Sequence, residues 1–439
     1  MKTRILAIVL GCCSTMVAQV GDYLGPGVLS RGAGDIGKRA GQDVDLRFFV
    51  SASGIYDNGI QPYSVDGNGN LITVGGLYGT EIGLGAYGTH KFHHAQLGLD
   101  YQGTYRHYSQ KSFYDGTDHT LALGYTYQKS RRLIFDMRQA AGTVSQGTNF
   151  AGVLPTLADA VVTPSSLLFD NRVNYLQSTL DINYLLSAHT TLTFGGDGFD
   201  VWRKAPGLIG MRGYMLHGEL LHRVTQRTTV GANYQHSHFD FPKAFGESDI
   251  NSFTGVFVTQ LGQYWTLNLS GGAFLAEVQG LQRVGVSPEI SALLGVSSTI
   301  EAFYQKSIYP QWDATLKRQF HRASLSFEYQ RGVSGGNGIY LTSRSDSAGA
   351  SLNYTAERRW SLSSSVAYAR LQGIGQDLQP FSQLIGGAGV TYSFSHPIQA
   401  FVRYDARHQE IVNGVYLQNS YRASIGVSFS PSDIPLSFH

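Results

Sequence analysis

Apolar and polar residues alternate one by one along most of the chain, and a segment near the C-terminus shows the pattern clearly. Tyr421, Ile425 and Phe429 fall on one face of an extended chain, whereas Arg422 and Gly426 fall on the other. Successive side chains of a β-strand point to opposite faces of the sheet. The segment is therefore predicted to be a strand with one apolar and one polar face, and it closes the regular part of the chain.

The same alternation begins at Val44 and recurs along the rest of the chain. Its polar faces carry ionisable residues, which suits a wet interior better than one half of a soluble sandwich. Such side chains either pair across the interior or line an aqueous path, and both interpretations remain open. The charged residues predicted to face inward are Asp100, Arg106, Asp136, Arg138, Asp181, Glu328, Arg403, Asp405, Arg407 and Arg422.

Short polar turns separate the predicted strands and recur at intervals of roughly 38 residues, with two intervals nearer 58, as in an up-and-down barrel. They fall at 88–91, 129–132, 187–189, 225–227, 262–263, 318–322, 356–359 and 395–397. With an opening strand near 45–56 and a closing strand at 420–429, we expect about 18 antiparallel strands, with 16 as the alternative. Short turns on one side and long loops on the other are typical of outer-membrane barrels.

The N-terminus predicts export. Lys2 and Arg4 precede an apolar run from Ile5 to Gly11, which is the order of a secretory signal. We expect residues 1–18 to be a signal peptide, 19–43 a Gly-rich periplasmic linker, 44–430 the barrel and 431–439 a tail. Because Cys12 follows Val-Leu-Gly, acylation of Cys12 is an open alternative to an unmodified signal peptide.

Composition agrees with an exported all-β protein. Charged residues make up 15% of the chain, and there are 53 Gly, 26 Tyr and 23 Phe. Few charges with abundant Gly and Tyr favour strands and turns over helices or disorder. The formal net charge of +2 argues against nucleic acid as a partner, and no run of about 18 apolar residues predicts a membrane-spanning helix.

All four tryptophans fall near predicted strand ends. Trp265 and Trp360 follow short turns, whereas Trp202 and Trp312 border long loops. Indole rings favour the interface between lipid and water, so this placement predicts one aromatic girdle at each end of the barrel.

Two long loops, at 143–171 and 278–309, interrupt the repeat and contain apolar segments. The second carries a helix signature at 287–295, with Ser and Pro at its start and Gly past its end. Either loop could fold into the barrel and narrow it, or the loops could pack on one another outside.

Candidate catalytic and metal-binding chemistry is weak. The run Gly332-Val333-Ser334-Gly335-Gly336 matches a nucleophile elbow but has no helix behind it. No residue is singled out as catalytic, no metal site is predicted and no cofactor is expected.

The chain after residue 43 resembles porin-type outer-membrane β-barrels of Gram-negative bacteria. In that family an aromatic-ended final strand is read by the barrel-assembly machinery, which implies that role for Tyr421, Gly426 and Phe429. Because ten residues follow Phe429, the penultimate Phe438 is the alternative signal. More weakly, Gly25–Gly32 and Pro431–His439 resemble barrels found with exopolysaccharide or exosortase systems, which implies polysaccharide-export components as partners.

We therefore expect a transmembrane antiparallel up-and-down β-barrel in the bacterial outer membrane, surrounded by lipid. Its expected function is a porin-like channel for passive passage of small solutes, or for export of a glycan. A barrel enzyme of lipase or protease type and a structural or adhesion barrel are the alternatives.

Overall fold

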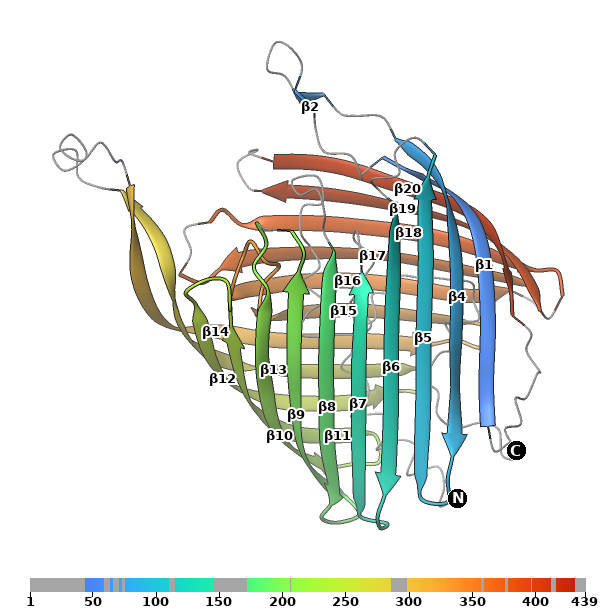
Figure 1. Ribbon diagram of the computed structural model, residues 1–439. Coiled ribbons are helices and arrows are strands. Elements are labelled where there is room, and N and C mark those ends of the chain that lie inside the picture. The colour runs from blue at the N-terminus through green and yellow to red at the C-terminus, as the bar shows by residue number, and fades with distance from the viewer. Residues whose placement is uncertain are drawn as a thin grey trace.

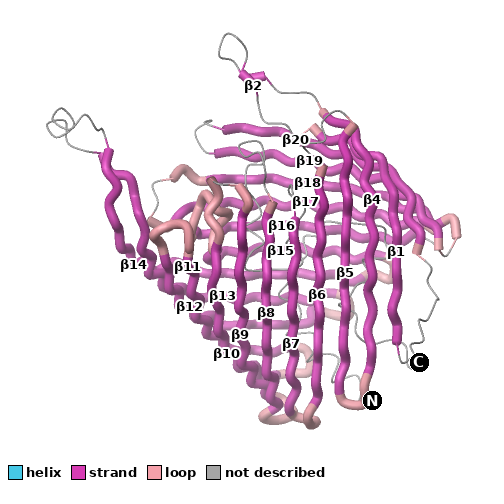
Figure 2. The backbone as a smooth tube through the Cα atoms, viewed as in Figure 1, coloured by secondary structure: helices cyan, strands magenta, loops and turns pink. Residues whose placement is uncertain are grey.

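The computed structural model describes residues 44–58, 64–65, 71–72, 76–109, 115–144, 172–205, 207–285, 298–356, 359–375, 378–395, 397–411 and 416–430. These residues form strands joined by turns and loops, and the strands build one large closed sheet (Figures 1 and 2). No helix with the length and hydropathy needed to cross a bilayer occurs in the described part of the chain.

Twenty strands follow one another along the described part of the chain. They are β1 (Val44–Asp57), β2 (Ser64–Val65), β3 (Leu71–Ile72), β4 (Leu77–Lys91), β5 (Ala95–Tyr108), β6 (Gly116–Gln128), β7 (Leu133–Val144), β8 (Val173–Leu185), β9 (Thr190–Arg203), β10 (Met211–Arg223), β11 (Thr228–Asp240), β12 (Glu247–Leu261), β13 (Trp265–Gly285), β14 (Ser298–Gln319), β15 (Ala323–Ser334), β16 (Ser343–Ala356), β17 (Trp360–Gly373), β18 (Phe381–Ser393), β19 (Ile398–Ile411) and β20 (Tyr416–Phe429).

Eighteen of these strands form a single antiparallel sheet in which each strand pairs with its neighbours in sequence, and β1 pairs with β20 to close it. At this seam Val50 lies opposite Phe429, and Asp57 lies opposite Arg422. The prediction of an antiparallel barrel with about 18 strands is confirmed, as is the pairing of the last strand with the first. The small strands β2 and β3 form a separate hairpin between β1 and β4.

The connections are short at one end of the barrel, which we call the turn end, and longer at the other, the loop end. The first turn lies at 92–94 instead of 88–91, because β4 continues to Lys91. The predicted loop 278–309 is wrong over most of its length. Residues 278–285 and 298–309 extend β13 and β14, which rise beyond the other strands as a long hairpin (Figure 1).

The outer wall is apolar over most of its height. Outward-facing side chains such as Ile82, Phe194, Phe253, Ile425 and Val427 are each at least half exposed. They alternate with inward-facing residues of low exposure, for example Ser428 at 1% beside Val427. We call this outward surface the apolar belt.

Polar side chains replace apolar ones on the outer wall near the loop end, and many of them pair across neighbouring strands. Arg212 Nε donates to Asp240 Oδ2 at 2.7 Å, and the Lys306 ammonium binds the Glu277 carboxylate. We call this band of polar residues the polar collar. Its members include Arg212, His236, His238, Asp240, Asp249, Asn251, Glu277, Lys306, Arg331, Asp346, His408 and Asn419.

Three of the four tryptophans lie near strand ends, and the aromatic girdles they would form stay a prediction. Trp265 and Trp360 begin β13 and β17 at the turn end, and Trp202 lies next to the last residue of β9 at the loop end. The placement of Trp312 beside a loop is wrong. It lies within β14, opposite Gly271, and its ring covers the position that a Gly271 side chain would occupy.

Candidate functional site

The inner wall of the barrel carries the ionisable residues. All the predicted inward-facing charges lie on it: Asp100 and Arg106 on β5, Asp136 and Arg138 on β7, Asp181 on β8, Glu328 on β15, Arg403, Asp405 and Arg407 on β19, and Arg422 on β20. Each falls between outward-facing residues of its strand, so the period of two decides the orientation. Their role as pore-lining residues stays a prediction.

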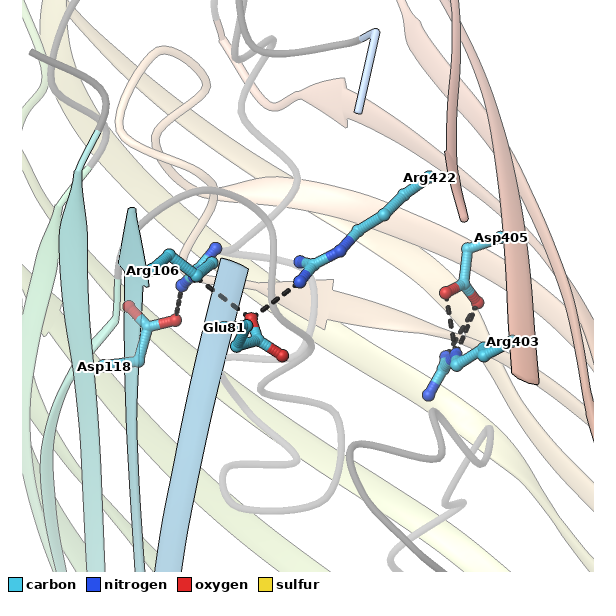
Figure 3. A network of polar contacts seen from close by, with 6 residues as sticks. All are labelled: Glu81, Arg106, Asp118, Arg403, Asp405 and Arg422. Carbon is cyan, nitrogen blue, oxygen red and sulfur yellow. Dashed lines mark hydrogen bonds and ion pairs between the residues drawn. The ribbon is translucent and has the colours of Figure 1, made fainter. Parts of the chain in front are cut away.

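A network of four charged side chains crosses the seam of the barrel (Figure 3). Arg422 Nη2 donates to Glu81 Oε2 at 2.6 Å, and Arg106 Nε lies 3.4 Å from the same oxygen. The Arg106 guanidinium also binds the Asp118 carboxylate. The network therefore links β20, β4, β5 and β6 across the intervening β1.

Arg403 and Asp405 form a second pair, on one strand. The two residues are two positions apart on β19, so their side chains share the inner face. The Nε of Arg403 donates to Asp405 Oδ2 at 2.7 Å and its Nη2 to Oδ1 at 2.7 Å (Figure 3). This bidentate interaction fixes both side chains against the inner wall.

Carboxylates on β7 to β9 are held mainly by neutral groups. Asp136 accepts from Thr126 Oγ1 at 2.7 Å and from Asn183 Nδ2 at 3.0 Å. Asp181 lies opposite Asp136 in the register, and its Oδ1 is 3.3 Å from His217 Nε2. Arg138 lies on the inner face of β7 as well, so both signs of charge occur on this part of the wall, whereas basic residues predominate on β19 and β20.

Sequence reasoning missed several inward-facing charges, including Glu81, Asp118, Asp197 and His217. Each alternates with outward-facing residues in the same way as those that were found; Glu81, for example, lies between Thr80 and Ile82. These residues could have been found by assigning alternate residues to the inner face along every predicted strand. Their partners could not be found that way, because the pairing depends on the register between strands.

A short loop between β15 and β16, residues 335–342, folds inward at the loop end. Asn337 is fully buried, and its Oδ1 accepts from the backbone N–H groups of Ile339 and Tyr340 at 3.2 and 3.0 Å. Gly336 and Gly338 have φ angles of 79° and 93°, which residues with a Cβ rarely adopt. We call residues 335–342 the inner loop.

The inner loop is held by strands and loops far from it in sequence. The Ile209 N–H donates to the Gly338 carbonyl at 3.0 Å, and the Ser248 and Thr342 hydroxyls are hydrogen-bonded at 2.5 Å. Tyr340 packs on Phe381 from the other side, with ring centroids 6.3 Å apart. These contacts join the loop to β12, to β18 and to the connection between β9 and β10.

An apolar cluster lies beneath the inner loop, on the inward face of β7 to β13. Phe199, Phe239, Ile250 and Phe274 are each at most 5% exposed and pack together there. We call this cluster, with the inner loop and the connecting residues 204–205, 207–210, 241–246, 374–375 and 378–380, the mouth cap. A side chain cluster of this kind excludes water from the part of the mouth it fills.

Several of the remaining sequence predictions concern residues outside the described ranges. The loop 143–171 lies outside the described residues except for Thr143 and Val144, which end β7. The helix predicted at 287–295 and the residues Cys12 and Phe438 also lie outside them. Tyr421, Gly426 and Phe429 lie on β20, and their role as an assembly signal stays a prediction.

The nucleophile-elbow motif spans the end of β15 and the start of the inner loop. Ser334 is 2% exposed, and its Oγ accepts from the Gly336 N–H at 3.1 Å, so it supports the turn. Within the described ranges, no group of three or more His, Cys, Asp or Glu residues is arranged to hold a metal ion.

No protein-family model matches the chain, and no curated protein matches it. Solved structures with similarity include Acinetobacter baumannii OccAB1, at 9% identity and a TM-score of 0.42, covering 91% of this chain and 100% of that one. Pseudomonas aeruginosa OccK2 (OpdF) has 12% identity and a TM-score of 0.44, covering 89% and 99%. Pseudomonas aeruginosa OpdQ has 11% identity and a TM-score of 0.42, covering 90% and 98%. Because these identities and scores are low, the functional conclusion rests on the barrel described above.

Proposed function

We propose that this protein is a channel of the bacterial outer membrane through which small polar solutes pass passively. The observation that carries the proposal is the two-sided wall, a closed sheet of 18 strands that is apolar outside and charged inside. A closed sheet leaves no unpaired backbone edge in lipid. Barrels of about 16 to 18 strands are wide enough to hold an aqueous path.

The apolar belt and the polar collar define the orientation. Lipid contacts the apolar belt, and the polar collar lies at the level of the outer head groups. The turn end then faces the periplasm, as is usual for barrels with short turns. The first residue of β1 and the last residue of β20 both lie at the turn end. A chain delivered from the periplasm would place these two ends on the periplasmic side.

The mouth cap is the constriction of this channel. Solutes entering from the loop end pass beside the inner loop and then meet the charged inner wall. The fixed side chains there, Arg422 and Arg403 among them, offer charge-assisted hydrogen bonds to polar solutes. The mouth cap therefore limits the size of solutes that can pass, and the charged inner wall below it favours polar solutes.

Planar-bilayer recording with purified protein tests the proposal. The wild-type barrel is expected to conduct, and replacement of residues 335–342 by a two-residue Asn-Gly turn is expected to raise the single-channel conductance. Absence of any conductance would refute the channel. Conductance that is unchanged in the loop variant would refute the constriction while leaving the channel intact.

Export of a glycan is a finer proposal, which rests only on the resemblance of Gly25–Gly32 and Pro431–His439. Both segments lie outside the described residues. Liposome swelling with neutral oligosaccharides of increasing length tests it, because a glycan path admits chains that exceed the cut-off of a small-solute pore.

A further inference from the structure

The hairpin of β13 and β14 has a strand edge with which no strand in the described ranges pairs. β14 pairs with β13 along its whole length, from Ser298 to Arg318, but it pairs with β15 only from Trp312 onward. No described strand lies against the other edge of Ser298–Gln311. A row of free backbone N–H and C=O groups of this length is a template for an added strand.

Most of this edge lies beyond the apolar belt. The ion pair of Lys306 with Glu277 belongs to the polar collar, so the part of β14 before Lys306 lies further out. An unpaired edge within lipid would cost several kcal/mol per group. Pro310, which has no N–H to leave unpaired, occupies the lower part of the edge, where the hairpin joins the wall.

Pro310 also shows which residues present the free edge. It lies opposite Ala273 in a ladder that continues without a break. In an antiparallel ladder each residue directs its N–H and C=O to the same neighbour, and alternate residues direct them to opposite neighbours. Because Pro310 cannot donate to β13, it points to the free edge, and so do Ile300, Ala302 and Tyr304.

The side chains of these same residues form an apolar surface. Ile300 is 66% exposed and Tyr304 is 64% exposed, which are among the highest values for apolar residues in the described chain. The opposite face is anchored, since Phe303 packs against the mouth cap. The hairpin is thus fixed on one face and displays apolar side chains on the other.

We propose that the free edge of β14, from Ser298 to Lys306, binds an extended segment of a partner protein as an added antiparallel strand. The bound strand carries apolar residues at alternate positions, which cover Ile300 and Tyr304. It also carries a basic residue near Glu301, because Glu301 is exposed and Lys306 already neutralises Glu277. This interaction goes beyond the channel function and does not require that the barrel conduct.

A second copy of the chain fits this edge less well. Two copies in one membrane share the same orientation along the membrane normal, so both β14 strands run from the loop end to the turn end. Antiparallel pairing between them would require one strand to turn over. Parallel pairing is slightly less stable per residue and places the two apolar faces on opposite sides of the pair.

Binding of a synthetic peptide to the full barrel in nanodiscs tests the inference. The probe has about nine residues, with valine alternating with threonine and lysine, and its affinity is measured by fluorescence anisotropy. Ala302→Pro removes one free N–H without touching the β13 ladder, and it is expected to weaken binding by about tenfold. Ala302→Val keeps the N–H and serves as the matched control, with unchanged affinity.

A charge exchange tests the same contact independently. Glu301→Lys is expected to weaken binding of the lysine peptide and to strengthen binding of a peptide with glutamate in place of lysine. Equal affinity of wild type and Ala302→Pro for the probe would overturn the proposal. So would barrel dimers that Ala302→Pro dissociates, because the occupant would then be a second copy. Conductance of each variant, measured in parallel, separates these outcomes from a failure of the channel proposal.

Discussion

Glu81 is the residue on which the seam network depends, since it accepts from Arg422 and lies beside Arg106. Its side chain is 23% exposed, so water screens the network only in part. Removing the negative charge leaves two inward-facing guanidinium groups close together with one partner fewer. The seam is therefore held by side chains as well as by the backbone ladder.

Glu81→Gln tests this role. We expect it to lower the stability of the folded barrel by about 1–3 kcal/mol, since loss of a charge-assisted bond leaves Arg422 poorly satisfied. The measurement is the temperature at which the folded, faster-migrating form disappears in semi-native electrophoresis. Glu328→Gln is the matched control, because Glu328 is an inward carboxylate for which the structure shows no ion pair among the described residues.

Two neighbouring residues of β20 test which face meets lipid. Ile425 is 65% exposed on the outer wall, whereas Ser424 faces inward. A charge in the apolar belt costs free energy that depends on depth, with Asp and Glu costing less than Arg and Lys. We expect Ile425→Asp to reduce the folded fraction and Ser424→Asp to fold as wild type does. The reverse pattern in a folding assay would mean that the faces are inverted.

At the scale of elements, the sequence predicted the strands well and the loop end poorly. Alternation alone locates β5 to β8 and β11, because one face of each strand meets an apolar surface and the other does not. The prediction was wrong at 278–309, because the longer interval between two turns was interpreted as a loop. The alternation of Ile300, Ala302 and Tyr304 in fact belongs to β14.

The inner loop could not be placed from sequence for a different reason. Its glycines predict a turn, but they do not predict whether the loop folds into the barrel or away from it. Its inward position depends on contacts with Ile209, Met211 and Ser248, which lie about a hundred residues away in the chain. No local pattern reports contacts of that kind.

Gly336→Ala tests the inner loop as a constriction. A Cβ at this position would overlap the Tyr340 and Leu341 carbonyl oxygens, and the φ of 79° is itself unfavourable, at a cost of about 1–3 kcal/mol. We expect the loop to leave its position, so that single-channel conductance rises or becomes noisier. Gly332→Ala has no atom within 4 Å of the new Cβ and should conduct as wild type does.

At the scale of the whole molecule, the inner wall mixes both signs of charge, often on one strand. On β7, Asp136 lies two positions from Arg138, and on β19, Asp405 lies between Arg403 and Arg407 on the inner face. Many of the basic groups are already paired with carboxylates. The described residues form no ring of a single sign around the path, and such rings are what give channels strong ion selectivity.

The expected result is weak ion selectivity. In a planar bilayer with a gradient of KCl, the reversal potential should be close to zero, because neither cations nor anions meet a one-signed barrier. A reversal potential near the limit for either ion would contradict this. Arg422→Gln should then move the potential toward cation preference, since it removes one positive charge from the inner wall.

The seam also governs how the chain can reach its native state. The hydroxyls of Tyr56 and Tyr421 lie 3.4 Å apart, although 365 positions separate the two residues. Contacts this distant in sequence form slowly, because the chain loses conformational entropy before the contacts contribute any stabilising free energy. Hairpins from β4 to β19 can form in order of synthesis, whereas closure waits for the last strand to arrive. Until then, β1 and the most recently added strand each expose an unpaired edge, which can pair with another chain. Protection of these two edges, more than formation of the hairpins, therefore determines whether the chain closes into a barrel or aggregates.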